Sequence, residues 1–151
     1  MAHVIGLISL SATAGVINSI TNASSSVFGL LNYIQLTKNS NTSELCNFLV
    51  KSDIDTTLKL LHSIITELNT NQTIQFNAPI LLALENINDS IGNIEAELVD
   101  IRQKIEYNNS LYVLTNMRGY DCTVNLKNME RGVAILEKRR KNLFHTIRLF
   151  A

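Results

Sequence analysis

The residues able to bind a metal or act as nucleophiles are few in this chain and stand far apart. His3, His62 and His145 fall in three separate predicted helices, and none has a Glu, Asp or Cys at metal-ligand spacing on its own helix face. Cys46 and Cys122 are the only cysteines, too few for a disulfide framework or a zinc site, so we predict free thiols. No metal and no cofactor are expected from this set.

The sequence also carries no recognisable catalytic motif. A Gly-rich phosphate loop, a nucleophile elbow and an HExxH pair are all missing from its 151 residues. The carboxylates of Asp53 and Asp55 point to different sides of a predicted helix, beside a predicted cap, so we do not expect them to share acid–base chemistry. We therefore predict a protein that is not an enzyme and has no small-molecule substrate.

The one dense cluster of charge is the basic run formed by Lys138, Arg139, Arg140 and Lys141. Roughly four to eight basic residues on an amphipathic helix can bind anionic lipid, so this run is a candidate contact for an anionic surface. A structural explanation is favoured over it, because acidic residues prevail in the predicted third helix and basic residues in the fourth, and opposite charges favour antiparallel pairing. Nucleic acid is not expected as a partner, because no aromatic platform or known binding motif accompanies the run.

The first segment of the chain, residues 1–37, has an unusual composition. Residues 1–37 contain no Lys, Arg, Asp or Glu. Large apolar residues recur there at the helical period, which predicts a helix over residues 4–36. The candidates for membrane contact or self-association on this helix are Ile5, Ile8, Val16, Ile20, Val27 and Leu30. Because the remaining positions carry Ser, Thr and Asn instead of charge, both sides of the helix can be covered by protein or lipid.

Several interpretations of this segment compete. A membrane span needs about twenty predominantly apolar residues, and polar residues such as Ser9 and Asn18 dilute the best window, residues 4–20. A secretory signal needs a positively charged start, and no basic residue precedes Lys38. The remaining alternatives are the central helix of a bundle, and a helix that leaves such a bundle to meet lipid or another copy.

Three more helices are predicted, at residues 43–69, 79–106 or longer, and 122–148. The third and fourth carry apolar residues in heptad seams, which favour packing of one long helix against another. We therefore predict an all-α fold: an antiparallel four-helix bundle with a long uncharged N-terminal helix and a C-terminal heptad-patterned helical hairpin. The bundle is expected to be a single domain over residues 1–151.

Local signals set the predicted helix boundaries. Asn41 is predicted to cap the second helix, and Ser52-Asp53 marks a point where that helix kinks or restarts. Pro79 suits the first turn of the third helix. The predicted core contains Ile8, Val16, Ile20, Val27, Leu61, Ile65, Ile87, Ile91, Ile94, Leu98, Val133, Leu136 and Leu143.

The N-terminal stretch MAHVIGLISLSATAGVINSI, uncharged and rich in small residues, followed by three helices with heptad seams, resembles the helical cell-death domains of the HeLo and MLKL-type group. The resemblance is one of architecture and covers the whole chain. It implies oligomerisation and membrane permeabilisation, with the first helix inserting and basic side chains meeting lipid headgroups.

Two functions are therefore predicted. The first is a non-enzymatic helical bundle that acts through self-association, in its extended form by membrane insertion of the N-terminal helix; such a protein is cytoplasmic and reaches a membrane on activation. The alternative is a structural protein, virion-associated or a scaffold, in a large DNA virus or similar assembly. Its composition fits, with Asn and Ile frequent and thirteen basic residues balancing thirteen acidic ones. The expected partners are further copies, partner helices or an anionic membrane.

Overall fold

The computed structural model describes residues 2–70, 77–111 and 119–150, with side chains from Thr13 onward in the first range. Every regular element in these ranges is a helix, so the all-α prediction is confirmed. The helices are α1 (Ala2–Leu36), α2 (Ser43–Ser52), α3 (Ile54–Thr70), α4 (Ala78–Ser110) and α5 (Thr123–Phe150).

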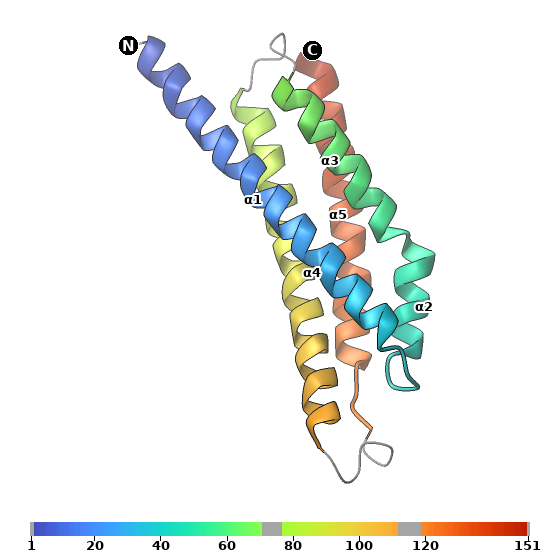
Figure 1. Cartoon of the computed structure of the whole chain (residues 1–151). Helices are drawn as coiled ribbons and strands as arrows, with labels where there is room; N and C mark the ends of the chain where they lie inside the picture. The colour runs from blue at the N-terminus through green and yellow to red at the C-terminus, as the bar shows by residue number, and fades with distance from the viewer. Residues whose placement is uncertain (1, 71–76, 112–118, 151) are drawn as a thin grey trace.

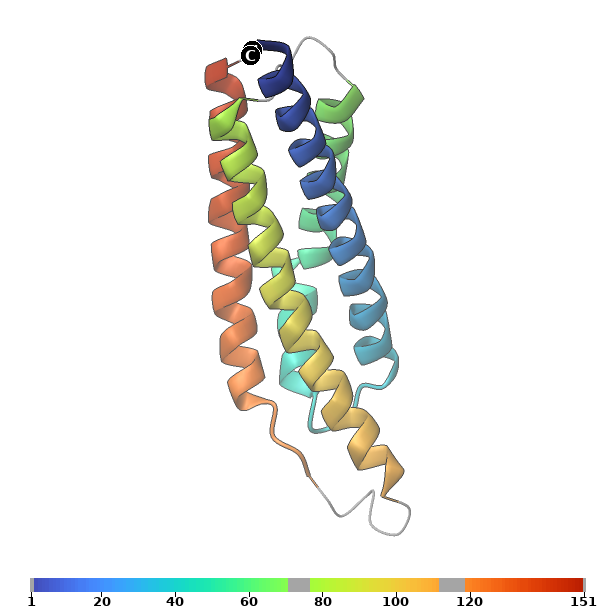
Figure 2. The same cartoon turned by 90° about the vertical axis from the view of Figure 1, so that its left-hand side faces the viewer.

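The chain runs up and down the long axis of the molecule (Figure 1). Helix α1 descends, α2 and α3 return one after the other, α4 descends again, and α5 returns beside it, as Figure 2 shows from the side. Helix α4 makes extensive contacts with α1 and with α5, while α2 and α3 contact both α1 and α5. Helices α1 and α5 therefore both pack mainly on α4. In Figure 1 the first turns of α1 diverge from α4.

The second predicted helix is divided in two at Asp53. This residue has a φ of 53°, in the left-handed region that Asp adopts more readily than most residues. Its N–H donates to the Val50 carbonyl and ends α2, and its own carbonyl accepts the N–H of Thr57 at 3.2 Å. The Thr56 hydroxyl also donates to Asp53 Oδ1 at 2.7 Å. Asp53 thus closes one helix and starts the next, as the restart alternative predicted.

Side-chain caps explain the starts of α4 and α5. Asn77 Oδ1 accepts the N–H of Ile80 at 3.1 Å at the start of α4, where Pro79 lies in the first turn as predicted. Asp121 Oδ1 accepts the N–H of Thr123 at 2.8 Å at the start of α5. The predicted cap at Asn41 is wrong, because Thr42 occupies that position and its side chain makes no capping bond.

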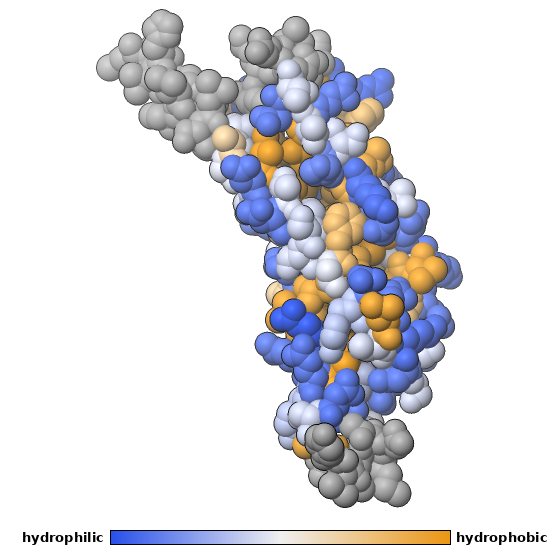
Figure 3. Space-filling model, in the orientation of Figure 1, coloured by the Kyte–Doolittle hydropathy of each residue, from blue (hydrophilic) through white to orange (hydrophobic). Residues whose placement is uncertain are grey.

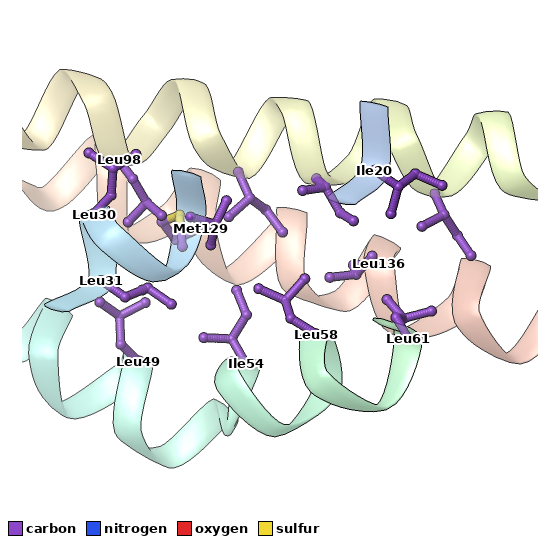
Figure 4. Close-up of a cluster of buried hydrophobic side chains, with 14 of the residues drawn as sticks. Ile20, Leu30, Leu31, Leu49, Ile54, Leu58, Leu61, Leu98, Met129 and Leu136 are labelled. Atoms are coloured by element: carbon purple, nitrogen blue, oxygen red, sulfur yellow. The ribbon is translucent and has the colours of Figure 1, made fainter. Parts of the chain in front are cut away.

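The core is a column of aliphatic side chains contributed by all five described helices (Figure 4). The predicted core residues that are buried are Ile20, Val27, Leu61, Ile65, Ile87, Ile91, Ile94, Leu98, Leu136 and Leu143. Val16 and Val133 are only half-buried and pack at the edge of this core. On α5 the fully buried apolar residues are Met129, Leu136 and Leu143, one every seven residues, so Val133 falls beside the seam. Ile8 lies outside the described side chains.

Candidate functional site: the outer faces of α1 and α5

Helix α5 is fixed on α4 by a buried amide. The side chain of Asn125 is 3% exposed. Its Nδ2 donates to Glu97 Oε2 at 3.0 Å and to Asp100 Oδ2 at 2.8 Å, and its Oδ1 accepts from Lys104 Nζ at 2.6 Å. Both donors of the amide and its acceptor are engaged, so rotation of α5 would leave buried polar groups unpaired. The bond from Asn125, together with Lys104, lowers the pKa of Asp100.

A second polar tie joins the same helices nearer the other end. Arg139 Nη1 donates to the carbonyl of Asn86 at 2.7 Å and to the hydroxyl of buried Ser90 at 2.8 Å. Between the two ties α5 has Gly132, where an added Cβ would lie 3.2 Å from Ile94 Cγ1. The helices approach closely there because glycine has no side chain. The two ties and this contact set which side of α5 faces solvent.

The predicted basic run does not form one cluster. Arg139 makes the tie to α4, and Arg140 is paired with Glu137 through two hydrogen bonds of 2.8 Å. This pairing lowers the pKa of Glu137 and raises that of Arg140. Only Lys138 and Lys141 of the run are exposed. Successive residues on a helix point in different directions, so adjacency in sequence is a poor guide to a shared surface.

The structure groups a different set of basic residues. The exposed bases of α5 form what we call the basic face: Lys127, Arg131, Lys138, Lys141 and Arg148. Their spacings of four, seven, three and seven residues keep them on one side of the helix. The face extends over about 30 Å at about 1.5 Å per residue. Sequence reasoning followed the adjacent bases and missed this face, although spacings of three, four and seven residues were its signal.

The outer face of α1 has no charge. The exposed residues between Thr13 and Leu36 form what we call the uncharged face: Ala14, Gly15, Asn18, Ser19, Asn22, Ser25, Gly29, Asn32 and Leu36. An added Cβ at Gly15 or Gly29 would meet nothing within 4 Å. Every other described helix exposes charged side chains, such as Lys51 on α2 and Glu85 on α4. The uncharged face is therefore a property of α1 alone among these helices.

The apolar residues predicted to contact a membrane or another copy lie on the opposite side of α1. Ile20, Val27 and Leu30 are buried in the core and Val16 is half-buried. Ile5 and Ile8 lie outside the described side chains. A role for Ile20, Val27 and Leu30 in membrane contact therefore requires α1 to separate from α4. Among the residues that the structure describes, none of the helices has both the length and the hydropathy that crossing a bilayer requires.

The two cysteines are shielded from solvent in the folded chain. Cys46 and Cys122 are buried and unbonded, as predicted. Burial raises the pKa of each thiol, which leaves less thiolate at neutral pH. Burial also raises the pKa of Tyr120, whose hydroxyl oxygen accepts from Asn39 Nδ2 at 2.9 Å. Among the described side chains of residues 13–70, 77–111 and 119–150, no three His, Cys, Asp or Glu residues are arranged to hold a metal ion.

Comparison of the chain with protein-family models, with curated protein sequences and with solved structures finds no match. The argument about function therefore depends on the two helix faces and on the ties that orient them.

Proposed function

We propose that this protein is a non-enzymatic helical module that associates with further copies of itself through the uncharged face of α1. The observation that carries the proposal is the absence of charge from every exposed position between Thr13 and Leu36. The centres of protein interfaces are depleted in charged residues, because desolvating a charge is costly. We further propose that α2 and α3 act together as one column of an antiparallel four-helix bundle.

Two glycines of the uncharged face support this proposal. Glycine in the interior of a helix costs about 1 kcal/mol relative to alanine. At Gly15 and Gly29 nothing in the described part of the chain fills the space that a side chain would occupy. Close approach of a partner helix gives these glycines a use that packing within the described chain does not give them.

Membrane permeabilisation is the extended form of the proposal, and the resemblance to HeLo and MLKL-type domains supports it. It requires α1 to turn its apolar side from α4 toward lipid, as an insertion step after assembly. The divergence of the first turns of α1 from α4 fits a helix that separates from that end (Figure 1). An anionic membrane is the partner in this form, and Lys138 and Lys141 remain available to meet its headgroups.

A structural subunit of a larger assembly, in a virion or as a scaffold, is the second candidate. Large apolar side chains are exposed on several helices instead of one, including Leu36, Val50, Leu82, Val124 and Leu149. On the side shown in Figure 3, hydrophobic residues lie in separate groups among hydrophilic ones. A subunit covered by neighbours on many sides accounts for this distribution better than one docking patch does.

The test places a charge on the uncharged face. Ser19 and Ser25 are exposed, so Ser19→Lys and Ser25→Lys should fold normally, as judged by circular dichroism and urea unfolding. We expect both to shift sedimentation velocity profiles toward the monomer, because a charge buried in an interface must lose its hydration. Ser25→Lys is the decisive variant, because Ser19 lies in a depression that Asp89 and Glu95 also line. The control is Ser63→Lys, the same change at an exposed serine of α3. Unaltered association of the two α1 variants would refute the proposal.

Dye release from anionic vesicles separates the two candidates. A permeabilising module should release dye, and Ser19→Lys should abolish the release while the Ser63→Lys control retains it. A structural subunit should release none at concentrations where it self-associates.

A further inference from the structure

The five residues of the basic face of α5 form no ion pair in the described part of their own chain, although the charge of Lys141 helps to lower the pKa of Glu137. Every ion pair described joins residues of the same helix, and the only one on α5 is that of Arg140 with Glu137. Lys127, Arg131 and Lys138 make no ion pair among the described residues. Glu130 is exposed at the edge of this side of α5 and offsets one of its five bases. The face therefore keeps an excess of positive charge in water.

The outer side of α4 carries the opposite charge. Glu85 and Asp89 are exposed and Glu95 is half-buried, and these three residues are what we call the acidic face. None of the three forms an ion pair in the part of the chain that the structure describes. Asp89 and Glu95 line a shallow, open depression of about 560 Å³, which also includes Ser19 of α1.

The shape of this depression suits long basic side chains. Gly92 lies in it, and an added Cβ there would meet nothing within 4 Å. Arg139 is the one cation of its lining, and its guanidinium is already bonded to the Asn86 carbonyl and the Ser90 hydroxyl. A lysine or arginine that entered beside Gly92 would meet the carboxylates of Asp89 and Glu95. The depression reaches Ser19, so it is continuous with the uncharged face.

We propose that the basic face of α5 in one copy binds the acidic face of α4 in a second copy. This inference rests on the proposed self-association and adds a second pair of surfaces that meet beside the uncharged face. Among the described residues, no ion pair joins the basic face to the acidic face of the same chain. A contact between two different faces is heterologous, and it produces a ring or an open chain of copies. The balance of thirteen basic and thirteen acidic residues lets identical copies pair in this way.

The experiment reverses two charges on each face in the full chain and then mixes the products. The first variant, Arg131→Glu/Lys138→Glu, removes the excess positive charge of the α5 face, because the two new glutamates and Glu130 offset the three remaining bases. The second, Glu85→Lys/Asp89→Lys, makes the α4 face basic. All four residues are exposed and lie outside the ties that hold α5 on α4. The neutral variant Arg131→Gln/Lys138→Gln is measured beside them, since it avoids any effect of reversed charge on folding.

The controls match the change in net charge at exposed sites elsewhere. Lys51→Glu/Lys59→Glu on α2 and α3 matches the first variant, and Glu44→Lys/Glu67→Lys on the same helices matches the second. Both controls should keep wild-type association. If they lose association as the face variants do, net charge and not the two faces governs assembly, and the inference fails.

Sedimentation velocity is the measurement. Each face variant alone should associate at least about tenfold more weakly than the wild type, since the attraction between the two faces is lost in the α5 variant and becomes repulsion in the α4 variant. The neutral variant should weaken association to a smaller degree. A mixture of the two reversed variants should recover association, because the acidic α4 face of one meets the basic α5 face of the other.

Four further results would overturn the inference, and the first three separate it from the proposed function. Unchanged association of the face variants, with association lost in Ser25→Lys, refutes these surfaces and leaves self-association through α1 standing. Weak association that mixing does not restore refutes their pairing with each other. Retained self-association with lost binding to anionic vesicles in Arg131→Glu/Lys138→Glu assigns the basic face to a membrane instead. If the wild-type protein is monomeric throughout, the proposed function fails together with the inference.

Discussion

Helices α1 and α5 pack on the same helix, α4, yet they present opposite kinds of surface to water. The exposed side of α1 has no charge from Thr13 to Leu36, whereas that of α5 has five basic residues. The means of attachment differ as well. Helix α5 is tied to α4 through Asn125 and Arg139, while α1 contributes aliphatic side chains such as Ile20 and Val27 to the core.

This difference has a mechanical consequence. Apolar burial is non-directional, and its contribution to stability is roughly proportional to the buried apolar area. A helix held by apolar burial therefore loses this contribution gradually as it shifts. A helix held by a satisfied polar network must break several buried hydrogen bonds at once. We therefore expect α5 to keep a fixed orientation and α1 to be the helix that shifts or separates when the protein changes its state of assembly.

The largest expected loss of stability comes from truncating the core of α4, the helix on which α1 and α5 both pack. Leu98 of α4 is fully buried (Figure 4). Leu98→Ala should lower the free energy of unfolding by about 2–5 kcal/mol, because truncation leaves a cavity in the core. Urea denaturation followed by circular dichroism measures it. Leu82 of the same helix is 58% exposed, and Leu82→Ala should change stability by less than about 0.5 kcal/mol. Equal losses would contradict the burial of the α4 seam.

Removal of a polar tie should leave α5 attached to α4 mainly by apolar contacts, as α1 is. Asn125→Ala leaves Glu97, Asp100 and Lys104 without their amide partner, and should cost about 1–3 kcal/mol in the free energy of unfolding. Asn142→Ala, at an exposed position of α5, is the control and should be nearly silent. Hydrogen exchange along α5 should also accelerate in Asn125→Ala. A variant with wild-type stability and exchange would show that the network does not fix the helix.

Replacing one glycine in each helix with alanine compares how closely α1 and α5 pack on their neighbours. Gly29→Ala on α1 should raise the free energy of unfolding by up to about 1 kcal/mol, since alanine favours the helix and nothing lies within 4 Å of the new Cβ. Gly132→Ala on α5 should gain less, because its Cβ would lie 3.2 Å from Ile94 Cγ1. Thermal unfolding of the two variants gives the order. A larger gain at Gly132 would contradict the close packing of α5 on α4.

Acid should weaken the attachment of α5 selectively, and this effect should be the smallest. The pKa of Asp100 lies below its ordinary value of 3.8 and that of Glu137 below 4.5, chiefly through hydrogen bonds from Asn125 and Arg140. A carboxyl with a lowered folded-state pKa stabilises the fold above its unfolded pKa, and this contribution disappears as the pH falls through the folded pKa. Both groups are largely in contact with water, so the loss should be modest.

Urea midpoints measured at neutral pH and below pH 4 test this dependence. The acid loss should be smaller in Asn125→Ala, since that variant lacks the bond that lowers the pKa of Asp100. Stability that rises on acidification would contradict the sign.

The fold followed from the sequence where apolar spacing was regular. Helix α4 has large aliphatic residues at every third or fourth position, and Ile87, Ile91, Ile94 and Leu98 are all buried as that spacing predicts. The sequence did not decide between a kink and a restart at Asp53, because glycine is a clear signal of a left-handed residue and aspartate is only a weak one.

The surfaces were harder to predict than the core. Bases 138–141 looked like a patch because they are adjacent, but Arg139 and Arg140 have partners in the folded chain. Asn125 is buried on α5, and the predicted core, which was drawn from apolar residues, does not include it. Its burial depends on three charged partners in α4, and no spacing within α5 reveals them. The absence of charge from α1 was visible in the sequence, but which side of that helix faces water was not.

The central claim is that this protein associates with itself through faces that its own chain leaves uncovered. Sedimentation velocity of the unaltered full chain, over a wide range of concentration and at low and high salt, tests it most directly. The account predicts a sedimentation coefficient that rises with concentration, and a smaller rise at high salt, where charge pairs are screened beyond about 3 Å at 1 M. A single species of monomer size at every concentration and salt would contradict it.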